Sequence, residues 1–306
     1  MIPTIFVLTL RHYRSWLESF AMSLTALVLL LTAALLHAGW NLLLKQTGER
    51  YILSWWSLLV ASLCFMPFLY AAWPLPNRVW PYVIASGIFQ AAYFIVLAAA
   101  YGRGDFSLVY PIARGAAPAL LAVWSFLLLK ETPHRAGAVG MVVLLAGLLI
   151  AGSSAWSNRK TAAAPSLTSV GLALLVAFCI SAYSVSDGAA VKFTSPTGYI
   201  VVEMFLTFLL ITPLILWRYS WPTIVAEWRT NWLRISLVGL LSNVTYLIVL
   251  VAYTLAPVSY AGAIREVSVV FAALAGWLWL NERFGSLRAI GASVIFAGIL
   301  VIAVVG

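Results

Sequence analysis

The sequence predicts an all-α integral membrane protein, in which ten transmembrane helices form two inverted five-helix repeats. Three observations predict this class. The 306-residue chain is 63% hydrophobic and only 9% charged, whereas soluble domains carry about 25% charged residues. Its apolar residues fall into runs of membrane-spanning length, and its two halves share residues at a nearly constant offset. A water-soluble core of this size cannot hide so much apolar surface.

Each expected helix follows from the length of an apolar run, because about 20 residues are needed to cross the hydrocarbon core. The connections are short, and the longest are residues 154–167 and 218–231. In order, the ten runs cover residues 23–44, 52–73, 80–101, 107–129, 136–153, 168–190, 198–217, 232–254, 257–280 and 288–305.

An internal repeat divides the chain into halves. The segment QAAYFIVL at 90–97 resembles NVTYLIVL at 243–250, an offset of 153 residues. Further along the chain, identical residues recur at an offset of 151: Arg114 with Arg265, Glu131 with Glu282, Gly140 with Gly291, and Gly147 with Gly298. Because each half holds an odd number of spans, the second half starts on the opposite side of the membrane. Inverted repeats of this kind are typical of secondary transporters.

The predicted domain organisation is an N-terminal extension (1–21), a first repeat (22–153), a linker (154–167) and a second repeat (168–306). The extension holds an apolar run too short to span a membrane. Its basic residues follow that run, whereas those of a signal peptide precede it. The Lys and Arg residues that flank the spans favour an external N-terminus by the positive-inside rule.

Other classes of protein are disfavoured. The net charge of +9 comes mainly from loop residues that contact lipid headgroups, and no nucleic-acid-binding motif accompanies it. Cys64 and Cys179 have neither metal-site nor disulfide spacing. The sequence contains no HExxH, nucleophile elbow, Walker loop or GxGxxG motif. We expect no enzyme activity, cofactor, metal or nucleic-acid partner. A small-molecule substrate and membrane lipids are the expected partners, and a homodimer is an open alternative to a monomer.

Three segments carry a family resemblance: LLHAGWNLLLK at 35–45, AYGRGDFSLVYPIARGAAPALLAVWSFLLLKE at 100–131, and AYTLAPVSYAGAIREVSVVFAALAGWLWLNERF at 252–284. Through them, residues 23–305 resemble the EamA family of the drug/metabolite transporter superfamily, ten-helix type. The resemblance implies export of small solutes across a bacterial cytoplasmic (inner) membrane, with both chain ends in the cytoplasm. This orientation disagrees with the one that the basic residues favour.

Charged residues inside spans are the first candidates for a site, because each costs roughly 2.5–3.5 kcal/mol at the bilayer centre. Arg114 and Arg265 occupy equivalent repeat positions. They could bind an anionic substrate group bidentately, or pair with carboxylates as structural groups. Neighbours on a helix point about 100° apart, so Glu266 should not face Arg265. We expect it to pair with Arg114 or another polar group, or to bind a proton.

The remaining acidic residues are interpreted by position. Glu203 lies within the seventh span and is the first candidate for proton coupling, since burial favours the protonated form of a carboxyl group. Asp187 ends the sixth span near Lys192 and is expected at the membrane interface. Glu131 and Glu282 end their spans and are expected to mark helix boundaries.

Polar residues that share a helix face complete the candidate substrate site. Gln90 with Tyr93, and Asn243 with Tyr246, are repeat equivalents that could line a cavity or join helices. His37, Trp40 and Asn41 share a face of the first span. The superfamily's small four-helix exporters use a glutamate in their first helix for proton exchange, and this sequence has none there, which disfavours simple cation/proton antiport. Trp40 and Asn41 are substrate-binding candidates, and His37 is either a candidate for proton coupling or a structural group. Pro111 and Pro118 are expected to loosen the fourth span.

These features predict a secondary-active transporter, an exporter of small polar metabolites, anionic ones included, such as amino acids or related compounds, working by alternating access. The segment LLHAGWN also looks like a subgroup linked to phosphonate metabolism, which leaves a phosphonate-related permease open. A flippase for a lipid-linked small molecule is another alternative. A membrane-embedded enzyme or assembly factor is the most remote one.

Overall fold

The computed structural model describes residues 23–45, 49–103, 106–157, 167–271, 274 and 286–305. Within these residues the secondary structure is entirely helical. The expected extension 1–21, most of the linker 154–167, and Glu282 lie outside them. The helices are α2 (Leu24–Lys45), α3 (Arg50–Ala72), η1 (Asn77–Val79), α4 (Trp80–Arg103), α5 (Phe106–Leu129), α6 (Arg135–Ser157), α7 (Leu167–Ala190), α8 (Pro196–Arg218), α9 (Trp221–Leu255), α10 (Val258–Arg265) and α12 (Ser286–Val305).

Most of these helices match the expected spans to within a few residues. Seven stretches of the described chain are long and apolar enough to cross a membrane, and they fall in α2, η1–α4, α3, α5, α7, α8 and α9. Shorter apolar stretches, Arg135–Ala151 and Ala289–Val304, lie in α6 and α12. Many large apolar side chains are exposed on the outside of the bundle. Large exposed apolar surfaces mark membrane contacts, so the protein is an integral membrane protein.

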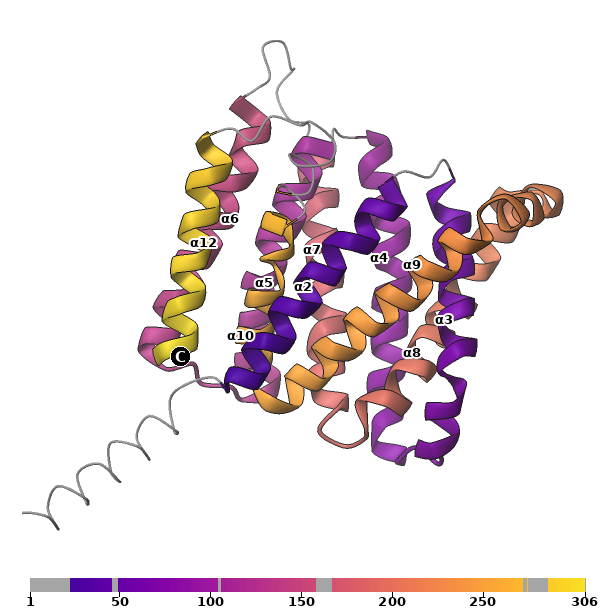
Figure 1. Ribbon diagram of the computed structural model, residues 1–306, viewed down its shortest axis with the longest axis horizontal. Helices are drawn as coiled ribbons and strands as arrows, with labels where there is room; N and C mark the ends of the chain where they lie inside the picture. Colours follow the sequence, from indigo (N-terminus) through magenta and orange to yellow (C-terminus); the bar gives the residue numbers. More distant parts are fainter. Residues whose placement is uncertain are drawn as a thin grey trace, which may run out of the picture.

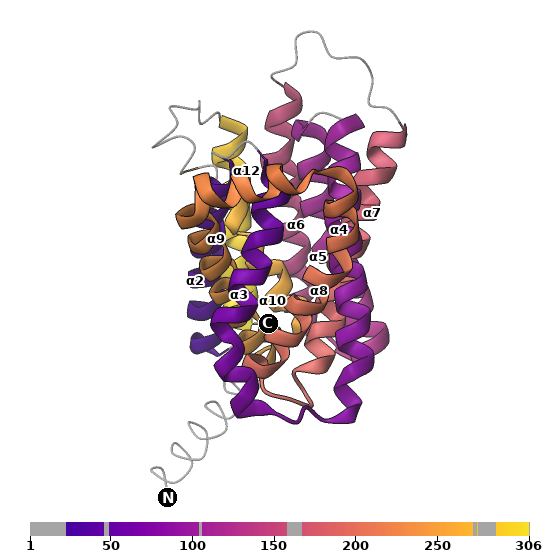
Figure 2. The ribbon, with the colours of Figure 1, turned by 90° about the vertical axis from the view of Figure 1, so that its right-hand side faces the viewer.

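The helices of the two halves interleave. The main pairings are α6 with α12, α5 with α7, α4 with α7 and α8, α3 with α8 and α9, and α2 with α9 and α10. Figures 1 and 2 show the helices side by side, with the start of α2 and the end of α12 at the same end of the bundle. A contact between α5 and α10 brings the two arginine-bearing helices together.

Close approach of backbones joins α6 to α12, which lie together at one edge of the bundle (Figure 1). A Cβ atom built on Gly147 would stand 2.6 Å from the backbone nitrogen of Ile295, and one built on Gly298 would stand 2.6 Å from that of Leu144. Only glycine leaves room for such contacts. Residue numbers rise along one helix as they fall along the other, so the pair is antiparallel.

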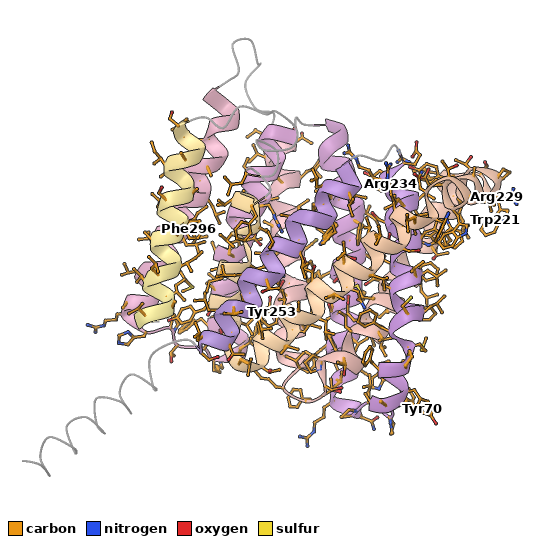
Figure 3. All side chains as sticks on the ribbon, in the orientation of Figure 1. Tyr70, Trp221, Arg229, Arg234, Tyr253 and Phe296 are labelled. Carbon is orange, nitrogen blue, oxygen red and sulfur yellow. The ribbon has the colours of Figure 1, made fainter. Side chains whose placement is uncertain are left out.

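The chain between the seventh and eighth spans is helical, whereas the sequence led us to expect a connection over 218–231. α9 begins at Trp221 and has non-helical backbone angles at Asn231 (φ −122°, ψ 17°). The segment before this kink lies across the end of the bundle, where Figure 3 labels Trp221 and Arg229 far from Phe296. This segment packs against α3 through the ring of Trp228, whose centre lies 5.0 Å from that of Trp56. Because the segment mixes polar and apolar residues, it does not form an apolar run in the sequence.

Candidate functional site

Arg114 and Arg265 meet at one carboxylate. Arg114 Nε lies 3.1 Å from Oε2 of Glu266, and Arg265 Nε lies 3.7 Å from Oε1 of the same side chain. The Glu266 side chain is only 1% exposed. The expectation that Arg114 is the partner of Glu266 is therefore confirmed.

The expectation that Glu266 does not face Arg265 is wrong, because the ninth span is not one continuous helix. α10 ends at Arg265, and Glu266 and Val267 form a turn. The amides of Glu266, Val267 and Val269 donate to carbonyls three residues earlier, so the chain winds more tightly here than an α-helix does. α5 runs without interruption from Phe106 to Leu129, with Pro111 and Pro118 inside it.

His37 is the next neighbour of Arg114. Arg114 Nη2 lies 2.9 Å from His37 Nε2 and donates to Ser268 Oγ at 3.2 Å. The Trp40 ring meets the His37 ring edge-on, with centroids 4.8 Å apart. Asn41 donates from Nδ2 to the His37 carbonyl at 2.7 Å, so its amide serves its own helix. The structure thus brings His37 and Trp40, but not the Asn41 amide, to the arginine pair.

Arg265 makes a corresponding contact on the other half. Its Nη2 lies 3.5 Å from Ser184 Oγ on α7, the first helix of the second half. Arg114 likewise reaches His37 on α2, the first helix of the first half. Each arginine therefore links the fourth span of its half to the first span of that half.

Asp187 lies near the end of α7, as expected, and is completely buried within the bundle. The hydroxyl of Tyr199 donates to Oδ1 at 2.6 Å, and the hydroxyl of Tyr246 donates to Oδ2. These donors come from α8 and α9, so Asp187 ties both helices to α7.

The remaining polar candidates lie around the Asp187 cluster. Gln90 Nε2 lies 3.6 Å from Met204 Sδ. Glu203 is fully buried and accepts from Thr207 Oγ1 at 3.1 Å. Asn243 is buried, and neither of its amide atoms has a hydrogen-bond partner among the described residues.

Three tyrosines form a row between the two groups of polar residues. The Tyr183 ring stands 6.2 Å from the Tyr93 ring and 6.2 Å from the Tyr246 ring, edge-on in both cases. Tyr93 and Tyr246, the repeat equivalents, thus flank one residue of α7. Tyr183 and Ser184 were missed as site residues. The signal was available, since Ser184 and Asp187 recur at helical spacing in SAYSVSDGAA.

Glu131 does more than mark a helix end. It follows Lys130, whose φ of 59° is in the left-handed region. Its carboxylate accepts from the Val258 amide at 2.8 Å, the Ser259 amide at 3.1 Å and Ser259 Oγ at 2.9 Å. A carboxylate at the first amides of a helix satisfies free donors and offsets the helix dipole. Glu131 therefore fixes the start of α10 and, through it, the position of Arg265.

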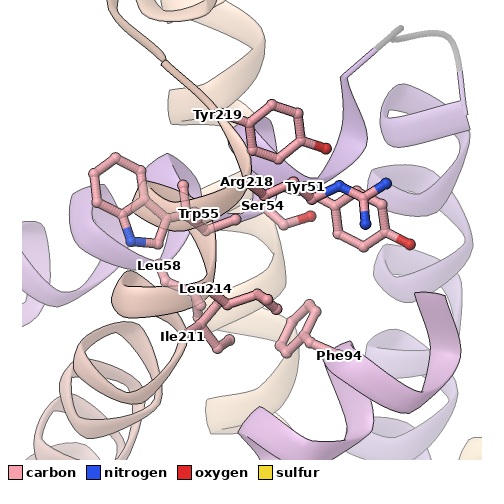
Figure 4. A pocket seen from close by; sticks show the side chains of 10 residues that line it. Tyr51, Ser54, Trp55, Leu58, Phe94, Ile211, Leu214, Arg218 and Tyr219 are labelled. Carbon is pink, nitrogen blue, oxygen red and sulfur yellow. The ribbon is translucent and has the colours of Figure 1, made fainter. Parts of the chain in front are cut away.

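One pocket lies away from this site (Figure 4). It opens between α3 and α8, with Phe94 of α4 opposite, and the Arg218 guanidinium stands 5.7 Å from the centre of the Tyr51 ring. Its cavity volume of about 30 Å³ admits one or two water molecules and no metabolite. None of the candidate site residues lines this pocket, so we do not assign it a role in solute binding.

The arginine cluster brings two guanidinium groups to one carboxylate. The contact between Arg114 Nη2 and His37 Nε2 requires a neutral imidazole, because arginine can only donate to it. Guanidinium groups form charge-assisted hydrogen bonds with anionic groups, and this is the chemistry that the cluster offers.

Comparisons with known proteins agree with this fold. The chain matches the EamA-like transporter family twice, over residues 24–153 and 167–304. A solved chain described as "Crystal structure of protein" superposes with a TM-score of 0.71 at 20% sequence identity, covering 90% of this chain and 96% of the solved one. That likeness concerns the fold alone. None of the curated proteins compared is significantly similar.

Proposed function

Because the chain belongs to the EamA-like transporter family, we propose that it is a secondary-active exporter of small polar metabolites with an anionic group, such as amino acids or related compounds. Arg114 and Arg265 bind that group. Gln90, Tyr93, Asn243, Tyr246 and Trp40 line the path of the solute, and proton coupling falls to a residue among His37, Glu203 and Glu266.

One observation carries this proposal. Two arginines from equivalent positions of the halves converge on the two oxygens of a single carboxylate. This carboxylate belongs to the chain itself, and it stands where the carboxylate of a solute would be bound. A solute that displaces Glu266, or that binds beside it, meets the donors that suit a planar anion.

The proposed architecture is ten spans in two inverted repeats that exchange conformations. The pairings of the helices support it. Exchanging each helix of the first half with its counterpart in the second turns the pairing of α4 with α7 into that of α9 with α2, and the pairing of α4 with α8 into that of α9 with α3. Both resulting pairings occur. The antiparallel α6–α12 contact is likewise unchanged by the exchange. We place the protein in the cytoplasmic membrane of a bacterium, as a monomer or a homodimer.

A binding screen tests the substrate-binding role. Purified protein is heated with alanine, N-acetylalanine or methylphosphonate, because a bound ligand raises the melting temperature. We expect at least one anion to stabilise the wild type. Arg114→Gln and Arg265→Gln should lose that shift, and Arg265→Ala should abolish transport while still inserting into the membrane.

The matched control is Arg229→Gln, which removes an exposed arginine on the outer segment of α9. It should behave as wild type. Arg265→Lys keeps the charge but loses the planar donor geometry, so it should bind the anion more weakly than wild type does. Wild-type transport by Arg265→Ala would return the arginine pair to a purely structural role.

A further inference from the structure

We propose that His37 is the proton-binding site of the transporter, and that Arg114 and a proton compete for its Nε2 atom. Solute and proton then load together and leave together, so export is driven by the outward gradient of the solute itself and not by an inward proton gradient. This inference rests on the proposed function, and it adds the identity of the coupling ion and the atom that binds it.

The competition follows from the chemistry of the two partners. A guanidinium group has N–H donors and no acceptor. The 2.9 Å contact between Arg114 Nη2 and His37 Nε2 therefore requires a lone pair on Nε2, with the ring proton on Nδ1. A proton arriving at Nε2 would use the same lone pair and would place two cations in contact. Nε2 can therefore bind either Arg114 or a proton at any one time.

The surroundings of His37 reinforce this exclusion. The charged groups nearest to it are Arg114 from α5 and Arg265 from α10, and Glu266 is paired with both arginines. On its own helix, His37 meets the ring of Trp40, and from the turn after α10 Ser268 shares the Arg114 donor. No carboxylate is in contact with the imidazole among the described residues. A protonated His37 needs the negative charge of a solute nearby.

Binding of an anion both frees the lone pair of His37 Nε2 and brings a negative charge close to the imidazole. In the empty protein, Arg114 Nη2 contacts His37 and Ser268, and Arg114 Nε faces Glu266. An anion bound by Arg114 draws the guanidinium away from His37, because a charge-assisted bond to an anion is stronger than one to a neutral imidazole. Nε2 is then free to bind a proton, and the anion offsets the new charge. Each of the two ligands therefore favours the binding of the other.

The consequence for transport is a fixed stoichiometry. One proton moves with each monoanion, so the loaded protein has the same net charge as the empty one. Arg265 has Ser184 in place of a histidine, and a hydroxyl cannot take up a proton in this way. The proton site is therefore present in one half of the pseudo-symmetric site and absent from the other.

Nitrogen NMR of the whole chain in nanodiscs tests the competition without any solute. The chain has three histidines, His12, His37 and His134, so His37→Gln identifies the His37 signals. In the wild type we expect an unprotonated Nε2 and a protonated Nδ1 between pH 8 and 6. In Arg114→Gln the His37 ring should take up a proton within or near this range. Identical behaviour of His37 with and without Arg114 would overturn the proposal.

A flux measurement tests the coupling. Proteoliposomes carrying a pH-sensitive dye receive N-acetylalanine, and movement of the anion and of protons is followed together. The wild type should move about one proton per anion. His37→Gln, which keeps an acceptor for Arg114 but no proton site, should move the anion without the proton. His134→Gln, the same change at an exposed position outside the site, should retain the coupling.

The outcomes separate the two proposals. Anion flux without protons in the wild type would overturn the role of His37 and leave the exporter intact. Absence of binding and flux for every anion of the panel would count against the proposed function, while the NMR result would still decide whether Arg114 and a proton compete.

Discussion

At the scale of residues, Glu266 decides how the arginine pair behaves. Bringing two guanidinium groups together in an apolar interior is unfavourable unless a carboxylate lies between them. Glu266 provides that carboxylate and is itself almost completely buried. It therefore offsets part of the repulsion between the two guanidinium groups.

Replacement of this carboxylate has a predicted signature. In Glu266→Gln both arginines lose the carboxylate that they share, and removing one member of a buried pair costs about 3–5 kcal/mol. The melting temperature should fall, and added N-acetylalanine should stabilise the variant more than the wild type. The measurement is a thermal melt with and without the anion.

Two outcomes of the same replacement would contradict our interpretation. If the variant has the melting temperature of the wild type, the ion pairs contribute little to the stability of the fold. If it is destabilised but the anion restores nothing, the space between the arginines does not accept a solute carboxylate.

The sequence was enough to predict part of this residue pattern. Matching positions in the two halves singled out Arg114 and Arg265, and charge complementarity suggested Arg114 as the partner of Glu266. The burial of Asp187 was not predictable in the same way. Its donors, Tyr199 and Tyr246, come from other helices, so only the packing of α7, α8 and α9 places it in the interior.

At the scale of elements, two helix features depart from the simplest reading of apolar runs. The tight turn after Arg265 contains neither proline nor glycine, so the sequence does not predict it. The two prolines of the fourth span, in contrast, leave α5 continuous. A run of apolar residues fixes where a helix crosses a membrane. It does not fix where that helix bends, because bends depend on contacts such as those that Glu131 makes with the start of α10.

The glycine contact between α6 and α12 gives a prediction at this scale. In Gly147→Ala the new Cβ meets the Ile295 backbone at 2.6 Å, and overpacking of this kind costs about 1–3 kcal/mol. The midpoint of thermal unfolding in detergent should fall. The same change at Gly171, where nothing lies within 4 Å, should be neutral or stabilising by up to about 1 kcal/mol. Equal effects at both glycines would mean that α6 and α12 do not approach this closely.

At the scale of the whole molecule, the proposed inversion of the halves makes a topological prediction. Glu49 precedes α3, and Lys192 lies at the equivalent place before α8; both are exposed. In Figure 1 the two connections lie at opposite ends of the bundle. Single reporter cysteines, Glu49→Cys and Lys192→Cys in a Cys64→Ser background, should react with a membrane-impermeant reagent from opposite sides.

Asn77→Cys, in the connection before α4, should react from the same side as Lys192→Cys. Tags on both chain ends should also be accessible from that side. Labelling of Glu49→Cys and Lys192→Cys from one side, or chain ends on opposite sides, would contradict the inverted arrangement.

The contact of α6 with α12 constrains how such a protein can move. Backbones that touch across four glycines cannot be pulled apart without exposing unfilled space, so the halves must stay joined along this edge. Under the proposed alternating access, rotation of one half against the other would then be smallest at this edge and would grow towards α3, α8 and α9. The glycine-lined pair would be the pivot of that rotation, and the kinked end of α9 would move furthest.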